Sequence, residues 1–244
     1  MTAPVPLALA FAFLLAAGCS SSREERASTT DEDGWQCVFE VDPGDWSSSG
    51  RNEWFVLEPG YRLEFENEKK TVHLVISVLE ETRRIDGVET RVVEEREEKN
   101  GKLEEVSRNY FAISKSANDV YYFGEDVDMY EDGKVSSHEG GWLSGANGAR
   151  FGLMLPARAV LGAKWYQEHA PGVALDRCEV TSNDKTLVTP AGEFLGCLEL
   201  TETTPLEPDA KDKKLFAPGV GLVKDGSLRL VRVQSASARS NSER

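Results

Sequence analysis

The fold class depends on the stretch "VETRVVEEREEKNGKLEEVSRNYFAI" (Val88–Ile113), which can be interpreted as one charged helix or as two strands. Glutamate and lysine favour helices, and Glu–Arg pairs with helical spacing are frequent here. However, Asn100-Gly101 would break a helix in its middle, and the scattered valines form no wide apolar stripe. Because Asn-Gly is a strong hairpin signal, the stretch predicts two long strands, Val88–Lys99 and Leu103–Ser114, with solvated outer faces.

The segment before it, "TVHLVISVLE" (Thr71–Glu80), shows the alternation of a half-buried antiparallel strand. The apolar residues that would share one face of this strand are Val72, Leu74, Ile76 and Val78. Asp86-Gly87 and Asp132-Gly133 predict two further hairpins. A similar alternation of apolar residues, from Trp35 to Val41, extends the strand pattern toward the N-terminus.

Proline-glycine turns punctuate the chain, as in "LFAPGVGLVKDG" (Leu215–Gly226) and its shorter echo "HAPGVALD" (His169–Asp176). Proline presets φ and glycine accepts positive φ, so each pair suits the centre of a type II turn. The remaining helix candidate is Ala149–Gly162, where Pro156 divides the apolar run and leaves room for one short helix or 3₁₀ turn. Many strands with short connections predict a mainly β fold: a large curved antiparallel meander that forms a half-barrel or open barrel.

The composition bounds the domain count and the classes of partner. The 244 residues include 42 acidic and 28 basic ones, which gives a formal net charge of −14. Phosphate binding needs a clustered basic face, so we expect no nucleic acid partner. Residues 35–234 suffice for one β domain with a substantial core, and residues 235–244 predict a disordered tail.

The N-terminus carries an apolar run, Val5–Ala17, that is too short for a permanent membrane span and is typical of a cleaved signal. The run leads into "AAGC" (Ala16–Cys19), which resembles the lipobox of bacterial lipoproteins, although no Lys or Arg precedes it. The resemblance implies a signal peptide of residues 1–18 and acylation of Cys19, for example with palmitate, as the first residue of the mature protein. The alternative is an ordinary secretory signal in which Cys19 happens to lie near the cleavage site.

The segment that follows, residues 19–34, contains no large apolar side chain and therefore predicts a disordered tether. A lipidated Cys19 before such a tether indicates an exported lipoprotein of the bacterial cell envelope, facing the periplasm, with the membrane as its partner through the N-terminal lipid.

Three cysteines remain, Cys37, Cys178 and Cys197, in a compartment that permits disulfides. An odd number leaves at least one free thiol. Tight turns at Asn183-Asp184 and Pro190–Gly192 would place Cys178 and Cys197 two strands apart, beyond the roughly 7 Å between Cα atoms that a disulfide allows. We therefore expect both thiols to stay reduced unless Cys37 reaches one of them.

A resemblance to a known family rests on five stretches in a fixed order: "NEWFVLEPGYRLEFE", "VYYFGEDVDMYEDGKV", "WYQEHAPGVALD", "LVTPAGEFLGCLEL" and "LFAPGVGLVKDG". In these stretches the chain resembles an uncharacterised family of exported bacterial proteins, whose (Tyr/Phe)-Ala-Pro-Gly-Val-Gly-Leu-Val-Lys signature matches residues 216–224. Phe216 stands where that family usually has tyrosine. The resemblance implies no activity. The curved sheet that it implies is similar to that of periplasmic lipoprotein carriers of the LolA type.

The sequence contains no catalytic or cofactor-binding motif with a known mechanism, so we expect neither a cofactor nor enzyme activity. The segment "DMYEDGKVSSHE" places Asp128, Asp132 and Glu139 at positions 1, 5 and 12 of a calcium loop, but Tyr130 occupies position 3. Because the Asp-Gly pair is already explained by a hairpin turn, this segment is a poor match to a metal site.

Two function classes remain open. The first is a noncatalytic lipoprotein whose curved sheet binds an apolar ligand or an envelope protein, with the apolar face from Val72 to Val78 turned toward the ligand. The second is a hydrolase-type enzyme built from scattered carboxylates such as Glu125, Asp126 and Asp128. The lining of the concave face distinguishes them, because apolar side chains favour a ligand carrier and converging polar groups favour catalysis.

Overall fold

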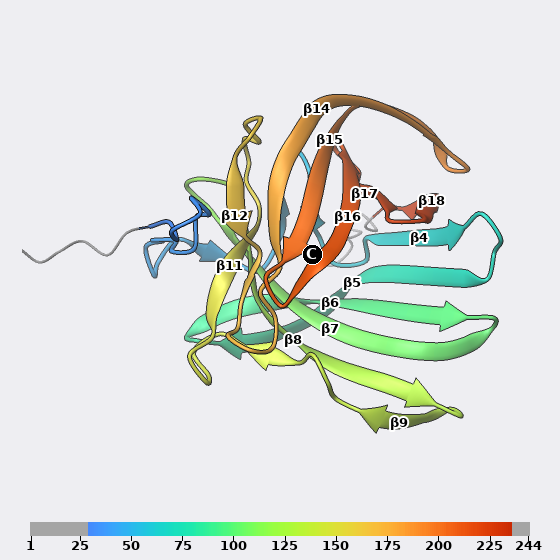
Figure 1. Cartoon of the computed structure of the whole chain (residues 1–244), viewed down its shortest axis with the longest axis horizontal. Helices are drawn as coiled ribbons and strands as arrows, with labels where there is room; N and C mark the ends of the chain where they lie inside the picture. Colours follow the sequence, from blue (N-terminus) through green and yellow to red (C-terminus); the bar gives the residue numbers. More distant parts are fainter. Residues whose placement is uncertain (1–28, 236–244) are drawn as a thin grey trace, which may run out of the picture.

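The computed structural model describes residues 29–235, and all regular secondary structure in that range is β-strand (Figure 1). The strands are β1 (Trp46–Ser47), β2 (Gly50–Arg51), β3 (Val56–Leu57), β4 (Arg62–Asn67), β5 (Val72–Ile85), β6 (Val88–Lys99), β7 (Lys102–Ser114), β8 (Val120–Glu131), β9 (Lys134–Ser137), β10 (Trp142–Leu143), β11 (Arg150–Leu155), β12 (Lys164–Tyr166), β13 (Glu168–His169), β14 (Arg177–Thr189), β15 (Gly192–Thr204), β16 (Glu207–Ala217), β17 (Gly221–Asp225) and β18 (Leu228–Gln234). The predicted mainly β fold is confirmed. The part of the chain that the structure describes contains no helix long and apolar enough to cross a membrane.

Sixteen of the strands form one antiparallel sheet that is nearly closed into a barrel, while β2 and β3 form a separate pair. The main path of the sheet runs β12-β14-β15-β16-β17-β18-β4-β5-β6-β7-β8-β11-β13. Its two ends, β12 and β13, are consecutive in the chain, so the short segment Lys164–His169 brings both edges of the sheet together. Gln167 lies between these two strands, at the seam of the barrel. Gly152 on β11 permits the close approach, because a Cβ there would lie 2.3 Å from the carbonyl oxygen of Gln167.

The three predicted Asx-Gly hairpins are confirmed. Asp86-Gly87 joins β5 to β6, Asn100-Gly101 joins β6 to β7, and Asp132-Gly133 joins β8 to β9. All six residues have positive φ, between 49° and 79°, as a type I′ turn requires. The long strands of the Val88–Ile113 stretch therefore follow from its central turn rather than from its helix-favouring composition.

Two predicted elements differ from the structure. The helix candidate Ala149–Gly162 is strand β11 followed by turns, because Arg150–Leu155 pairs with the free edge of β8 and so completes the sheet. The Trp35–Val41 segment forms no strand. Its ladder contacts are two isolated bridges of Gln36, one antiparallel with Thr30 and one parallel with Trp165.

The described end of the predicted tether, residues 29–34, contacts the barrel. Asp31 accepts hydrogen bonds from the hydroxyl of Tyr166 at 3.0 Å and from the backbone N–H of Trp35 at 2.8 Å. The backbone N–H of Cys37 donates to Thr29 at 2.9 Å. The described residues before Trp35, from Thr29 onward, thus contact the β domain, whereas the predicted signal peptide, Cys19 and the predicted tail from 236 onward lie outside the described residues.

Cys178 and Cys197 lie on adjacent strands, not two strands apart as the sequence predicts. The error is the turn expected at Asn183-Asp184, because β14 passes through that dipeptide with only a shift of register against β15. Cys178 is opposite Glu202, and Cys197 is five residues before Glu202 on the same strand, so the two cysteines are separated by about 15 Å along the strands. All three described cysteines are free thiols in the structure.

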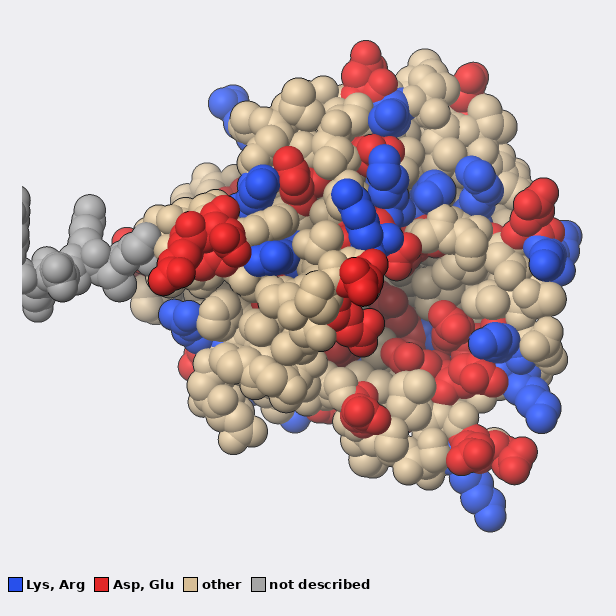
Figure 2. Space-filling model, viewed as in Figure 1, with Lys and Arg blue, Asp and Glu red and all other residues tan. Residues whose placement is uncertain are grey.

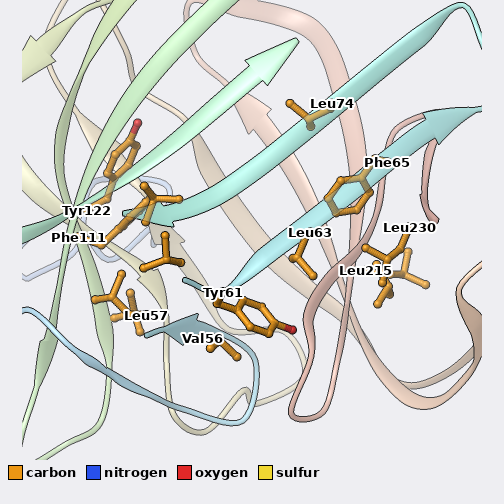
Figure 3. Packing of buried hydrophobic residues seen from close by; sticks show 14 of the residues in the cluster. Val56, Leu57, Tyr61, Leu63, Phe65, Leu74, Phe111, Tyr122, Leu215 and Leu230 are labelled. Atoms are coloured by element: carbon orange, nitrogen blue, oxygen red, sulfur yellow. The ribbon is translucent and has the colours of Figure 1, made fainter. Parts of the chain in front are cut away.

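One buried cluster fills the interior of the barrel (Figure 3). Leu74 and Val78 of β5 belong to it, and Val72 and Ile76 pack against it, as the alternation predicts. Phe111 and Tyr122 stack within it, with ring centroids 4.7 Å apart.

Candidate functional site

An apolar pocket lies inside the barrel, where β5, β6 and β7 face β16 and β17. Its walls include Ile76, Val78, Val93, Phe111 and Phe216. The pocket has a volume of about 100 Å³, which is less than the roughly 300 Å³ or more of most ligand sites. Core side chains therefore fill most of the concavity, and the remaining space fits a group no larger than a benzene ring.

An acidic chamber of about 190 Å³ adjoins this pocket, and Glu95, Phe111, Met154 and Lys214 line both spaces. The carboxyl side chains that line the chamber come from five strands and a loop: Glu95, Glu105, Glu125, Glu168, Asp176 and Glu202. Among the described residues that line it, Lys214 is the only basic one. In the view of Figure 2, acidic side chains gather around a hollow near the centre of the molecule.

Alternation along β6 brings Glu95 into the chamber. The register pairs Val93 with Val78 and Glu95 with Ile76, so the Glu95 side chain lies on the same interior face as the two valines. The prediction that the acidic residues of this stretch lie on solvated outer faces is therefore wrong for Glu95, and also for Glu105.

A β-bulge on β8 brings Glu125 into the same chamber. Asn109 is opposite Glu125 and Phe111 is opposite Tyr122, so one residue of β7 faces two residues of β8. Strict alternation would place Tyr122 and Glu125, three residues apart, on opposite faces of the strand, and the extra residue returns both to the interior. The Tyr122 hydroxyl then donates a hydrogen bond to Oδ1 of Asn109 in the interior.

This bulge requires glycine. Gly124 has a φ of 122°, which side chains rarely adopt. A Cβ at this position would also lie 2.2 Å from the carbonyl oxygen of Trp142 on the neighbouring strand β10. The backbone at Gly124 is therefore the local feature that aims Glu125 inward.

The chamber perturbs the protonation of its own side chains. Burial, with repulsion from neighbouring carboxylates, raises the pKa of Glu95 and of Glu125 to about 7. Burial also raises the pKa of Glu168 well above its usual range. Burial alone would lower the pKa of Lys214, but Glu202 at 2.9 Å and a second carboxylate, at 3.9 Å, raise it above its ordinary value. The chamber thus holds several carboxyl groups for one ammonium group.

Gln167, at the seam of the barrel, has an unpaired acceptor next to these carboxyl groups. The residue lines the chamber and is 3 % exposed. Its Nε2 donates to the carbonyl oxygen of Met154 at 3.2 Å, which sets the orientation of the amide. Its buried Oε1 has no hydrogen-bond donor among the described residues. A buried carbonyl without a donor costs about 1–3 kcal/mol, so the folded chain keeps this acceptor at a cost.

The carboxylates named from sequence divide between the two faces of β8. Glu125 lines the chamber, whereas Asp126 pairs with Arg83 and Asp128 pairs with Arg108 at 3.3 Å. The three therefore do not form one catalytic group. Sequence reasoning missed Glu95, Glu168 and Gln167.

The calcium-loop residues are not gathered around a common point. No group of three or more His, Cys, Asp or Glu side chains within residues 29–235 could hold a metal ion, so Asp128, Asp132 and Glu139 do not form one. Asp132 lies in the β8–β9 hairpin turn and is exposed, as is Glu139. The lipidation candidate Cys19 lies outside the described residues.

Comparison with known proteins gives one structural likeness. No protein-family model matches the chain, and no curated protein matches it. The chain is similar to the crystal structure of a predicted lipoprotein from Parabacteroides distasonis ATCC 8503, with 10 % sequence identity and a TM-score of 0.36, over 76 % of this chain and 100 % of that chain. A TM-score of this size does not establish a shared fold, and the resemblance of the five sequence stretches to an exported family stays a prediction.

Proposed function

We propose that the chain is an exported, lipid-anchored binding protein without catalytic activity, whose barrel takes a small apolar group into its interior pocket. The observation that supports this is the pocket of about 100 Å³, which is walled mainly by aliphatic and aromatic side chains and adjoins the acidic chamber. Of the four residues expected to face a ligand, Ile76 and Val78 line the pocket, whereas Val72 and Leu74 pack in the core. The volume favours a short alkyl or aryl group over a long acyl chain.

Binding of n-hexanol, measured by isothermal titration calorimetry, tests the pocket. A buried methylene contributes about 0.8 kcal/mol, and the entropy of association opposes it, so we expect a Kd in the millimolar range. Ile76→Phe fills the pocket and should weaken binding at least tenfold. Val72→Phe places the same side chain on the same face of β5 but outside the pocket, and should leave binding unchanged. Absence of saturable hexanol binding by the folded chain, or equal weakening in both variants, would contradict the proposal.

The proposed anchor is an acyl group on Cys19, which would hold the barrel near a membrane through residues 20–28. Cys19→Ala should release the protein from the membrane fraction or leave it as an uncleaved precursor. Intact mass measurement decides the point, because a mature chain that begins elsewhere and carries no acyl mass rules out this anchor.

A second candidate function, hydrolysis, is favoured by one observation. Glu95 and Glu125 share a cavity and both have a pKa of about 7, which suits general acid-base catalysis near neutral pH. Hydrolysis of nitrophenyl esters or glycosides that disappears in both Glu95→Gln and Glu125→Gln would support an enzyme. Equal turnover by the unchanged chain and both variants would exclude these two residues as its catalytic pair.

A further inference from the structure

We propose that the acidic chamber recognises an organic ammonium ion, so that the ligand is a small amphiphilic amine whose apolar part enters the adjoining pocket. This inference rests on the proposed binding function and adds the chemical class of the ligand. Three features of the described residues support it: uncompensated carboxyl groups, an unpaired acceptor on a buried residue that lines the same chamber, and the absence of a metal-binding geometry.

The carboxyl groups of the chamber exceed the cations available to them. Lys214 is already engaged by Glu202 at 2.9 Å and by Asp225 at 3.9 Å. Within residues 29–235, Glu95, Glu125 and Glu168 form no ion pair with a lysine, arginine or histidine. A cation that enters the chamber therefore meets acceptors without partners, whereas an anion is repelled by carboxyl groups that outnumber the one lysine.

The orphan acceptor of Gln167 is independent of these charges and points to the same ligand. Because Nε2 is held by Met154, the amide cannot satisfy Oε1 by turning over without losing that hydrogen bond. A buried carbonyl oxygen requires a donor, and an ammonium group carries N–H donors in several directions. Gln167 and the neighbouring Glu168 reach the chamber from the closing segment, while Glu125 reaches it from β8 and Glu95 from β6.

The arrangement of the acidic side chains favours an ammonium ion over a metal ion. A metal ion needs three or more ligands around one point, and no such group exists in the described part of the chain. Carboxyl groups spread over several strands suit a larger cation, which is bound by separate hydrogen bonds. The apolar pocket shares Glu95 and Lys214 with the chamber, so one molecule can place an ammonium group in the chamber and a short alkyl or aryl group in the pocket.

Three six-carbon probes separate this inference from the proposed function: n-hexylamine, n-hexanol and hexanoate, titrated into the full-length chain at pH 8. We expect hexylamine to bind at least tenfold more tightly than hexanol, and hexanoate to bind more weakly than hexanol. If hexanol binds and hexylamine is no tighter, the ammonium inference is overturned while the binding function stands. If none of the three binds, both are overturned.

Variants then assign the recognition to the chamber. Gln167→Met removes the orphan acceptor and Glu168→Gln removes a carboxyl group that a bound ammonium ion would ionise; each should weaken hexylamine binding at least tenfold and change hexanol binding less than twofold. The control is Glu98→Gln, which removes a charge of β6 outside the chamber and should affect neither ligand. Thermal unfolding of each variant establishes that it is folded. Folded variants with unchanged hexylamine affinity would overturn the assignment.

Discussion

Glu95→Gln should stabilise the fold at pH 8 and leave it unchanged at pH 4. Burial of Glu95, with repulsion from other acids, raises its pKa from 4.5 to about 7. The folded chain therefore binds more protons than the unfolded chain between these values. The free energy of unfolding consequently falls as pH rises through that window, since the folded state must accommodate a charge that water would solvate better.

The magnitude follows from the two pKa values. One pKa unit corresponds to about 1.4 kcal/mol, so an increase from 4.5 to about 7 corresponds to about 3 kcal/mol of destabilisation at pH 8. Glutamine has nearly the same volume and removes the charge, so Glu95→Gln should recover most of this energy. Glu95 also repels Glu125, so the double variant should gain less than the sum of the two single gains.

Urea unfolding at pH 4 and pH 8 measures the effect. Glu94→Gln is the matched control, because Glu94 is the neighbouring residue on the opposite face of β6 and pairs with Arg108 at 3.6 Å on the surface. This control should lose no more than about 1 kcal/mol at pH 8, the usual range for exposed pairs. Equal stability of Glu95→Gln and the unchanged chain at pH 8, or the same gain at pH 4, would refute the reasoning.

Three further predictions concern the stability of variants at Gly124 and Lys214 and the redox state of the cysteines. Gly124→Ala should destabilise the fold by at least about 3 kcal/mol, because the added Cβ would lie 2.2 Å from the Trp142 carbonyl oxygen. A variant as stable as the unchanged chain would show that the bulge tolerates a side chain. Lys214→Met leaves the carboxylate of Glu202 unpaired and should cost about 3–5 kcal/mol at pH 8 and less at pH 5, where Glu95, whose pKa is about 7, is protonated and no longer repels it; an equal loss at both pH values would contradict an electrostatic origin. Thiol titration of the denatured chain should count all three described cysteines as free, and a mapped bridge between Cys178 and Cys197 would show that β14 and β15 pair differently.

The hairpins could be predicted from sequence because a two-residue turn is a local event. Asp86-Gly87 pairs Ile85 with Val88, so even-numbered residues of β5 share a face with odd-numbered residues of β6. The same parity places Glu95 on the interior face with Ile76, and the two-residue register shift further along the hairpin preserves it. The signal for Glu95 was therefore present, but the charge of the side chain favoured the solvated interpretation.

The other parts of the site could not be predicted, because they depend on contacts between distant segments. Glu125 faces inward through a bulge that the carbonyl of Trp142 imposes at Gly124, and no periodicity reveals such a bulge. Gln167 reaches the chamber because its segment pairs with β14 on one side and β11 on the other and so joins the two edges of the sheet, which no pattern within residues 164–169 indicates. The turn expected at Asn183-Asp184 failed for the same reason, since pairing with β15 outweighs the turn preference of two residues.

Closure of the barrel and the charge of its chamber have opposite effects on the stability of the folded chain. The backbone N–H groups of Gln167 and Glu168 both donate to the carbonyl of Asp176, at 2.8 and 3.1 Å, which holds the closing segment in place. The same segment carries the Glu168 carboxyl into a chamber where Asp176 and Glu125 repel it. A cation that binds only the closed barrel stabilises it by about 2.7 kcal/mol at a hundredfold excess over its Kd. The acids that destabilise the free protein are thus the ones that would attract an ammonium ion, so stabilisation by Glu95→Gln and loss of hexylamine affinity should occur together. A Glu95→Gln chain that gained stability and kept full hexylamine affinity would separate the two effects and show that Glu95 does not contribute to recognition.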